Sequence, residues 1–503
     1  MPFRSLLLLL FLAPGILPAQ SGPRTFLGDS LDQYILKGMQ RWDIPGMQVL
    51  VIHKGQVAYM KAFGVLEKGK PEKVTPSTLF MIGSNTKAFT GTAMALLEHR
   101  GQCSLQDPVT KYYHEFRMKD AWVSQHVTLT DVLTHRLGMM TFQGDFIYWG
   151  SSLDRDQCIE KFGNLVPAYP FRTKYGYTNL GFAIADKCLE LIDGRPWARF
   201  MRDEFFTPLG MDQTFAHSTE MATRNNLSAA HSLIDGQIRS FPRLHNDNIG
   251  AAASIWSSVD EMKHWMLLQL NQGKHNGKQL IPAAVIARTY QPETIYGAVG
   301  HAFNPRNFIL YGLGWFLEDY DGHKIVSHTG GVDGFVSAVT LIPDQGTGIV
   351  ILTNTDQNSM YSTLNREIVD ACLGLPFRNY DSLVYNRAEI QHLQDKALHQ
   401  ARLDSAEAYT QPIDPKLAGS YTNEYYGSVK LEARERSLEM TFQHHPNLSC
   451  TLRPIAPGRF LATYSSPTYG ETVFPFSEKE GKISFELSVN DFLEFTTYTF
   501  TRD

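Results

Sequence analysis

A serine and a lysine three residues apart form the part of the sequence best suited to chemistry. Ser84-Asn85-Thr86-Lys87 follows an apolar run, residues 78–83, and precedes residues 88–100, which have helical character. A helix that begins here places Ser84 in its first turn and Lys87 one turn later on the same face. A serine hydroxyl is an effective nucleophile only when a neighbouring base takes its proton. Lysine can be that base if its pKa falls from about 10.4 towards roughly 7–8.

The spacing alone leaves a second interpretation open. A serine that caps a helix, followed by a solvated lysine, produces the same tetrad without any chemistry. Two later motifs favour chemistry, because Tyr177-Thr178-Asn179 and then His328-Thr329-Gly330-Gly331 follow the tetrad in this order. Tyr421-Thr422-Asn423 repeats the second motif with no partner motif around it. We therefore interpret Tyr421 as a core residue at a strand end.

With these motifs in this order, the chain resembles the serine beta-lactamase-like family of penicillin-recognising hydrolases. That family includes class C beta-lactamases, D-alanyl-D-alanine carboxypeptidases, D-aminopeptidases and some esterases. The resemblance covers about residues 25–375, and four weaker segments support it: 133–138, 208–211, 311–315 and 343–344.

The resemblance implies roles for four side chains. Ser84 attacks a carbonyl carbon and forms an acyl-enzyme. Lys87 and Tyr177 share the proton transfers, and the sequence leaves open which of them is the formal base. Asn179 orients Lys87 and the substrate amide through its donor and acceptor groups.

The third motif supplies the other half of the implied site. The backbone N–H groups of Ser84 and Gly331 form the oxyanion hole, and Gly330 and Gly331 let the strand approach the substrate closely. His328 departs from the family pattern, since beta-lactamases and carboxypeptidases usually carry lysine there. Histidine is largely neutral at pH 7 and cannot replace that fixed cation. An esterase or a D-residue peptidase or amidase is therefore favoured, and a histidine that only packs in its strand is the alternative.

Two other functions remain as alternatives to a serine hydrolase of esters, amides or D-residue peptides. One is a beta-lactamase or a cell-wall D-Ala-D-Ala carboxypeptidase, and the other is a catalytically silent binding scaffold. The sequence contains no Gly-x-Ser-x-Gly motif, which excludes an α/β-hydrolase. We expect no cofactor and no metal.

The charge of the chain indicates which kinds of partner it binds. The formal net charge is −5 and no lysine- or arginine-rich run occurs, so we expect small-molecule or peptide substrates and no nucleic acid. The oligomeric state stays open.

The five cysteines are widely scattered, which predicts buried free thiols rather than a disulfide framework or a zinc site.

The N-terminus predicts export. Residues 1–19 combine Arg4, a short apolar run at 6–12 and a small residue, Ala19, suited to cleavage, which is typical of a signal peptide. No later stretch is long and apolar enough to span a membrane. We expect a secreted or periplasmic protein without a membrane span after signal removal.

The organisation of the chain predicts two folded parts. Residues 20–375 form the catalytic domain, an α+β fold in which strands from both ends (47–53, 56–63, 324–327, 335–342 and 347–353) share one antiparallel sheet around a helical insert. Within it, we expect helices at 129–133, 181–191, 197–206 and 259–270, and a loop, 139–152, that shapes the pocket. Residues 376–415 are a linker with a helix at 386–408.

Residues 416–503 contain eight short alternating strands, the last at 495–500, which suit a closed, lipocalin-like barrel or a sandwich. We assign this domain a binding or structural role, so its removal is expected to change substrate range or solubility more than the bond-breaking step. His444 and His445 are expected in a solvated turn rather than at a metal.

Overall fold

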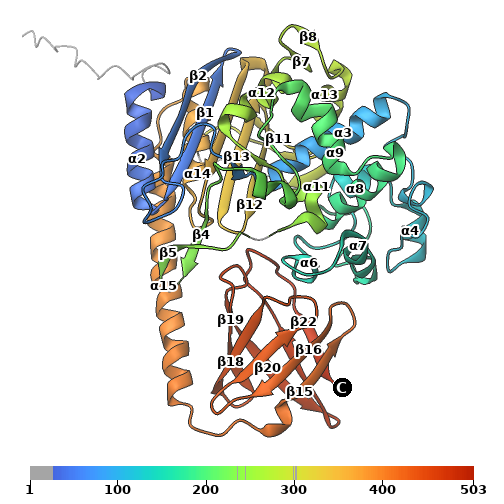
Figure 1. Cartoon of the computed structure of the whole chain (residues 1–503), viewed down its shortest axis with the longest axis vertical. Helices are drawn as coiled ribbons and strands as arrows, with labels where there is room; N and C mark the ends of the chain where they lie inside the picture. The colour runs from blue at the N-terminus through green and yellow to red at the C-terminus, as the bar shows by residue number, and fades with distance from the viewer. Residues whose placement is uncertain (1–25, 235, 244, 298–299, 301–302) are drawn as a thin grey trace, which may run out of the picture.

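The computed structural model describes residues 26–503 except 235, 244, 298–299 and 301–302. A sheet flanked by helices stands above a closed barrel, and one long helix connects them along the side (Figure 1). The predicted signal peptide, residues 1–19, lies outside the described residues. Within the described part of the chain, no helix has the length and apolar character needed to cross a bilayer.

The large sheet joins both ends of the catalytic domain, as the sequence predicts. β1 (Gly46–His53) pairs with β2 (Gln56–Gly64) on one side and with β14 (Thr347–Thr353) on the other, and all neighbours are antiparallel. The α+β prediction is confirmed. From β14 the sheet continues through β13 (Phe335–Ile342), β12 (His323–Val332), β11 (Phe316–Tyr320), β10 (Ile309–Tyr311) and β9 (Thr294–Gly297).

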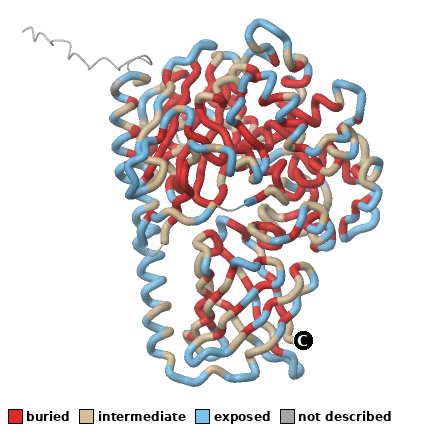
Figure 2. The backbone as a smooth tube through the Cα atoms, in the orientation of Figure 1, coloured by how far each residue is buried: buried red, intermediate tan, exposed pale blue. Residues whose placement is uncertain are grey.

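Helices cover both faces of this sheet. Alternate residues of β1 enter two different cores, since Val49 and Val51 pack with α2 (Leu31–Arg41) and α14 (Met360–Leu373), whereas Leu50 packs beneath the helical insert. A strand buried on both faces reads as one apolar run, which explains why β1 lacks a polar side. Figure 2 shows this double-sided core as the most buried part of the molecule.

The helical insert lies between β2 and β9. Its long helices are α3 (Thr86–His99), α8 (Asn179–Asp193) and α12 (Val259–Leu270). The helix expected at 197–206 is divided into α9 and a π-helical turn, Arg202–Phe206. The shorter helices are α4 (Ala121–His126), α5 (Leu129–Leu133), α6 (Asp145–Tyr148), α7 (Arg155–Asn164), α9 (Trp197–Met201), α10 (Thr207–Leu209), α11 (Gly250–Ala253) and α13 (Ala283–Thr289).

Six of the short strands in this region pair two by two outside the large sheet, and β3 also carries the chain into the turn that holds Ser84. They are β3 (Phe80–Met81) with β6 (Trp256–Ser257), β4 (Ala230–Ile234) with β5 (Gln237–Phe241), and β7 (Lys274–His275) with β8 (Lys278–Gln279).

The linker helix α15 (Tyr380–Ala408) begins six residues before the predicted start. Its first turn is anchored to α2, because the buried carboxylate of Asp381 accepts hydrogen bonds from Arg41 at 2.5 Å and from the Trp42 indole at 2.6 Å. Beyond this anchor the helix is largely exposed (Figure 2). Tertiary contact rather than local pattern therefore sets where it begins.

The C-terminal domain is a closed antiparallel barrel, which decides between the two predicted architectures. The last predicted strand, 495–500, instead begins at Tyr498, because the preceding residues reach across to the catalytic domain. The five cysteines are free and buried, as predicted. The barrel strands are β15 (Gly419–Asn423), β16 (Gly427–Ala433), β17 (Leu438–Phe442), β18 (Ser449–Ala456), β19 (Arg459–Tyr464), β20 (Glu471–Lys479), β21 (Lys482–Leu487) and β22 (Tyr498–Arg502).

Candidate active site

Ser84 lies in a single 3-10 turn, Gly83–Asn85, that leads directly into α3. The turn requires glycine at its first position for two reasons. Gly83 has a φ of +56°, and a Cβ there would lie 3.0 Å from the backbone nitrogen of Gly331. The turn that holds Ser84 therefore lies directly against Gly330 and Gly331 of β12, which are distant in the sequence.

Lys87 is completely buried, so the interpretation as a solvated lysine is wrong. Its Nζ lies 2.9 Å from Ser84 Oγ, 2.7 Å from Asn179 Oδ1 and 3.0 Å from the Ala252 carbonyl oxygen. Burial lowers the pKa of Lys87 well below its ordinary 10.5, although the carboxyl of Asp145 opposes this.

These three contacts suit a neutral amine. The oxygens of Asn179 and Ala252 can only accept, so they take the two N–H groups of an uncharged Lys87. The remaining lone pair then faces Ser84 Oγ and can accept its proton. The geometry therefore matches a general base next to its nucleophile.

Asn179 is held in one orientation by Asp145. The Asn179 Nδ2 group donates to Asp145 Oδ2 at 2.8 Å, which turns the Asn179 carbonyl oxygen towards Lys87. Both side chains are almost completely buried. Burial raises the pKa of Asp145 well above its ordinary value. Sequence reasoning placed Asp145 only within the pocket loop 139–152, because an isolated aspartate in a loop carries no motif.

Tyr177 completes the group around the nucleophile. Its hydroxyl hydrogen-bonds the Ser84 hydroxyl, and Lys87 Nζ lies 4.7 Å from the centre of its ring. Burial raises the pKa of Tyr177 above its ordinary value, and only the bond from Ser84 opposes this. The phenol therefore keeps its proton near neutral pH. Of the two candidate bases left open by the sequence, the geometry favours Lys87.

His135 supports Tyr177 from behind. The two rings stack with centroids 4.2 Å apart, and His135 Nδ1 accepts a hydrogen bond from the backbone N–H of Thr178 at 3.1 Å. Burial, together with the nearby Lys87, lowers the pKa of His135 well below 6.5, so the ring is neutral. The segment 133–138 was recognised from sequence only as a family-like run, without this role.

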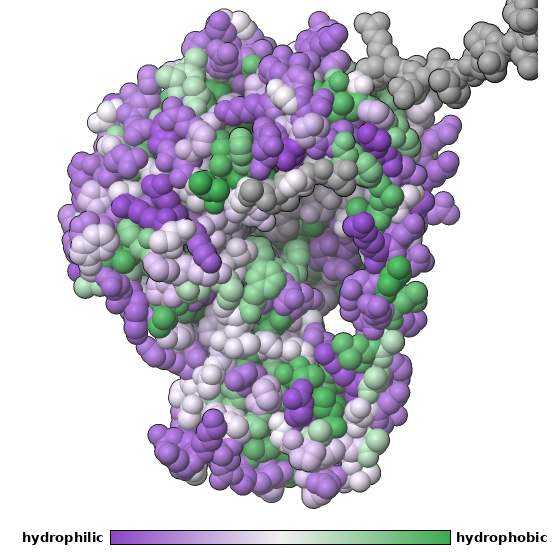
Figure 3. All heavy atoms as spheres, turned by 180° about the vertical axis from the view of Figure 1, so that it is seen from behind, coloured by the Kyte–Doolittle hydropathy of each residue, from purple (hydrophilic) through white to green (hydrophobic). Residues whose placement is uncertain are grey.

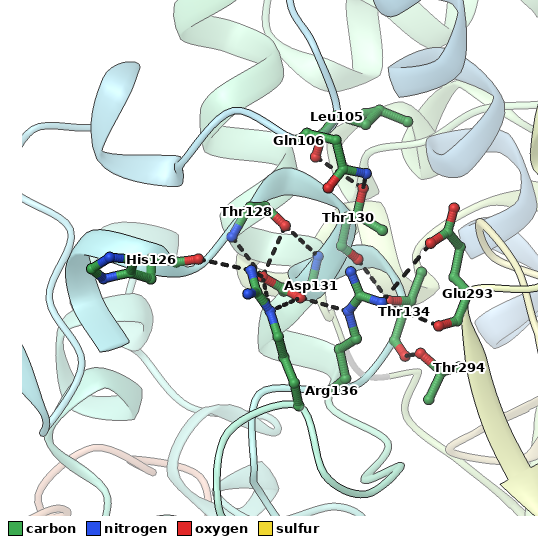
Figure 4. A network of polar contacts seen from close by, with 11 residues as sticks. Leu105, Gln106, His126, Thr128, Thr130, Asp131, Thr134, Arg136, Glu293 and Thr294 are labelled. Carbon is green, nitrogen blue, oxygen red and sulfur yellow. Dashed lines mark hydrogen bonds and ion pairs between the residues drawn. The ribbon is translucent and has the colours of Figure 1, made fainter. Parts of the chain in front are cut away.

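A buried ionic network fixes the chain just before His135 (Figure 4). Asp131 of α5 is fully buried and accepts from Arg136 at 2.5 Å, from Arg172 at 2.6 Å and from the backbone N–H of Thr128 at 2.8 Å. Arg136 also donates to the carbonyl oxygen of Glu293 at 3.1 Å, at the edge of β9. The network ties α5 to the sheet and so determines where His135 and Tyr177 lie.

His328 lies near the same residues, with its ring centroid 6.1 Å from that of Tyr177, but the ring is neutral. Its Nδ1 donates to the Thr329 carbonyl oxygen at 2.6 Å. The other ring nitrogen, Nε2, therefore has no proton and accepts a hydrogen bond from the Tyr311 hydroxyl at 3.0 Å. Burial, with a smaller effect of Lys87, lowers the pKa of His328 to about 3. This position therefore carries no positive charge for a substrate carboxylate. The sequence indicates Tyr311 only as part of the family-like segment 311–315 and does not reveal its hydrogen bond to His328.

The edge of β12 faces the nucleophile. β11 pairs with β12 only up to Ser327, whereas β13 pairs with it up to Val332. The following segment, with Gly330 and Gly331, therefore leaves one backbone edge open towards the turn of Ser84. A Cβ at Gly330 would lie 2.0 Å from a carbonyl oxygen beside that turn, so only glycine fits. The Gly331 backbone therefore lies beside the turn of Ser84, where the sequence predicts the oxyanion hole.

The barrel contributes aromatic side chains to the same region. A Cβ at Gly331 would lie 3.4 Å from the ring of Phe492, and Phe495 stacks on Phe142 with centroids 5.8 Å apart. Phe142 in turn lies 5.6 Å from the ring of Tyr177. Seen from behind, the surface is hollowed where the catalytic domain meets the barrel (Figure 3).

The expectation of a solvated turn is wrong for His445. This side chain is buried against the catalytic domain, where its Nε2 donates to the Trp149 carbonyl oxygen at 3.0 Å and its Nδ1 accepts from Tyr426 at 2.7 Å. The domain interface, which the sequence does not reveal, removes it from solvent. Tyr421, by contrast, is a buried residue of β15, as predicted.

The beta-lactamase family model matches residues 31–373, so the chain belongs to the beta-lactamase family. An unguisins hydrolase of Aspergillus campestris is 28% identical over 422 residues, covering 79% of this chain and 76% of that protein. The family and this relative together indicate a hydrolase.

Two solved structures share the fold. An octameric penicillin-binding protein homologue from Pyrococcus abyssi has a TM-score of 0.60 and 19% identity, covering 94% of this chain and 99% of that chain. A D-stereospecific amidohydrolase from Streptomyces sp. has a TM-score of 0.54 and 19% identity, covering 67% of this chain and 97% of that chain.

Replacing Asp131 by asparagine should destabilise the catalytic domain. Burial alone would raise the pKa of Asp131, but Arg172, Thr128 and Arg136 outweigh it and hold the pKa below its ordinary value. Loss of the charge leaves the partly exposed side chains of Arg136 and Arg172 without their buried partner, which should cost about 1–3 kcal/mol of unfolding free energy. Urea unfolding of Asp131→Asn measures this cost.

Asp344→Asn is the matched control, because Asp344 is half exposed in its pair with His323 and should matter far less. Equal unfolding midpoints for the two variants would contradict the role assigned to Asp131.

Proposed function

We propose that this chain is an exported serine hydrolase that cleaves small esters, amides or D-residue peptides through an acyl-enzyme on Ser84. The observation that carries the proposal is the position of the buried Lys87 Nζ, 2.9 Å from Ser84 Oγ, where a neutral amine would turn its lone pair to that hydroxyl. The family membership and the unguisins hydrolase relative support the reaction class. Export is supported by residues 1–19 of the sequence alone.

In the proposed reaction, Ser84 Oγ attacks the carbonyl carbon while its proton passes to Lys87 Nζ. The negative oxygen that develops is stabilised by the N–H groups of Ser84 and Gly331. Tyr177 gives its phenolic proton to the leaving group and takes one back from Lys87, so both return to their starting states. A water molecule then repeats the sequence on the acyl-enzyme and releases the acid.

The neutral state of His328 supports the substrate class. A beta-lactamase or a carboxypeptidase must bind a carboxylate next to the scissile bond, and a fixed cation serves that purpose. His328 has its Nδ1 proton and Nε2 lone pair both engaged within the protein, and its pKa of about 3 excludes a charged ring near neutral pH. Substrates without that carboxylate are therefore preferred.

A fluorophosphonate probe should label the wild-type protein at Ser84 and leave Ser84→Ala unlabelled. The probe reacts only with an activated serine, so the result separates an enzyme from a silent scaffold. Ser405→Ala, on the exposed face of α15, is the control and should label normally. Labelling of folded Ser84→Ala would place the nucleophile elsewhere.

Lys87→Ala and Tyr177→Phe should each slow acylation by at least about a hundredfold, as loss of general acid–base help usually does. The wild-type rate should rise with pH to a plateau, with a midpoint well below 10.5, because only the neutral amine accepts the proton. Lys87→Ala should lose this rise. Stopped-flow acylation by an activated ester measures both, and near-normal rates in either variant would reject its role.

A substrate panel tests the specificity. Simple esters and D-residue amides without a carboxylate at the leaving side should be turned over at least about a hundredfold more efficiently than beta-lactams or D-Ala-D-Ala peptides, the scale that a missing charge partner can produce. Measured kcat/KM values for the three classes decide this. Preferred turnover of beta-lactams or D-Ala-D-Ala peptides would favour the alternative function.

A further inference from the structure

One barrel residue, Glu494, is buried inside the contact with the catalytic domain. It lies in the segment between β21 and β22 and is 1% exposed. One carboxylate oxygen accepts from the backbone N–H of Gly144 at 2.8 Å, and the other accepts from the backbone N–H of Phe146 at 2.7 Å. Thr496 and Tyr498 of the barrel also donate hydroxyl groups to it.

The two bonded N–H groups flank Asp145. They belong to the start of α6, a single helical turn whose first N–H groups have no partner within the helix. One turn is too short to hold its shape without outside contacts. Phe146 adds a second contact, because its ring stacks on Tyr426 of the barrel at 4.9 Å. The barrel therefore fixes both neighbours of Asp145.

Asp145 begins a continuous path to the nucleophile. Its carboxyl accepts from Asn179 at 2.8 Å, Asn179 accepts from Lys87 at 2.7 Å, and Lys87 lies 2.9 Å from Ser84 Oγ. Each of these groups has one orientation that satisfies its neighbours. A displacement of Asp145 would turn Asn179 and release the Lys87 amine from the position in which its lone pair faces Ser84.

We propose that Glu494 is a positioning residue through which the C-terminal barrel holds Asp145, and thereby Asn179 and Lys87, in the geometry required for acylation. The inference rests on the proposed acyl-transfer reaction. It also revises the expectation that removal of residues 417–503 spares the bond-breaking step, because that deletion removes the anchor of α6.

The charges along this path predict a specific change in the pH dependence of acylation. Burial raises the pKa of Glu494 to about 7, so above neutral pH its charge opposes ionisation of Asp145. An ionised Asp145 would in turn favour protonated Lys87. Removal of the Glu494 charge should therefore make Lys87 harder to deprotonate and move the acid limb of acylation to higher pH.

Other titratable groups face the same path. Tyr148 lies on α6 beside Asp145, and Tyr498 donates to Glu494 from β22. His135 and His328 both lie near Lys87, and burial keeps both rings neutral. Since the pKa of each phenol is raised and that of each imidazole is lowered, these four groups do not titrate where the acid limb is measured.

Glu494→Gln tests the inference in the full-length protein. The amide keeps the size of the side chain but faces one N–H group with a donor instead of an acceptor. Acylation by the fluorophosphonate probe should slow by at least about tenfold, in keeping with the cost of misplacing catalytic groups. With an ester substrate, kcat should fall by a similar factor while KM changes less than about threefold, and the acid limb should move to higher pH.

Glu424→Gln is the matched control, because Glu424 is exposed and pairs with Lys119 at 3.1 Å across the same two domains rather than with α6. It should behave as wild type. Wild-type rates in folded Glu494→Gln, a slower rate with an unmoved acid limb, or an equal loss in Glu424→Gln would each overturn the inference.

Two further variants keep the test decisive. Glu494→Asp retains the charge, so its acid limb should match that of the wild type, but its acylation rate should be lower. If Glu494→Gln does not fold, a wild-type acylation rate in Glu494→Asp overturns the inference. Adding Glu494→Gln to Asp145→Asn should cause no further loss, because both act on one path. An unlabelled wild-type protein would instead refute the proposed function itself.

Discussion

The burial of the Lys87 amine is the constraint on which the rest of the structure depends. An ammonium group is costly to bury without a paired charge, so the protein favours the neutral amine, and the neutral amine is the form that can take a proton from Ser84. The direct contacts of the amine suit this state. Asn179 and Ala252 accept its two N–H groups, and Tyr177 covers it with a protonated phenol.

The site lies where four separately built parts meet. The turn before α3 and its first residues carry Ser84 and Lys87, and the open edge of β12 carries Gly330 and Gly331. The stacked rings of His135 and Tyr177 lie on one side, and the barrel contributes Phe492. Asp131 and Glu494 play similar parts in this assembly, because each is a buried carboxylate that fixes a short, weakly self-stabilised helix. The proposed role of Glu494 would make the barrel part of the active-site framework rather than an appended module.

The sequence predicts what local pattern and motif order determine. Strands such as β13 and β14 and helices such as α5 and α12 have the expected bounds, because apolar periodicity and turn residues specify them. The motif residues do converge around Lys87. Glu494 and the burial of His445 could not be predicted, because their surroundings arise from the contact between two domains. The role of Asp145 could not be predicted either, because an isolated acidic residue gives no sign of its distant partner. The shifted starts of α15 and β22 have the same cause.

The most direct test of this account is the titration of the Lys87 amine itself. In protein labelled with carbon-13 at the ε-position of lysine, the Lys87 resonance is the one missing from the spectrum of Lys87→Ala. The account predicts that this resonance titrates with a midpoint well below the ordinary 10.5. A midpoint at or above that value would show a charged amine next to Ser84 and would contradict the assignment of Lys87 as the base.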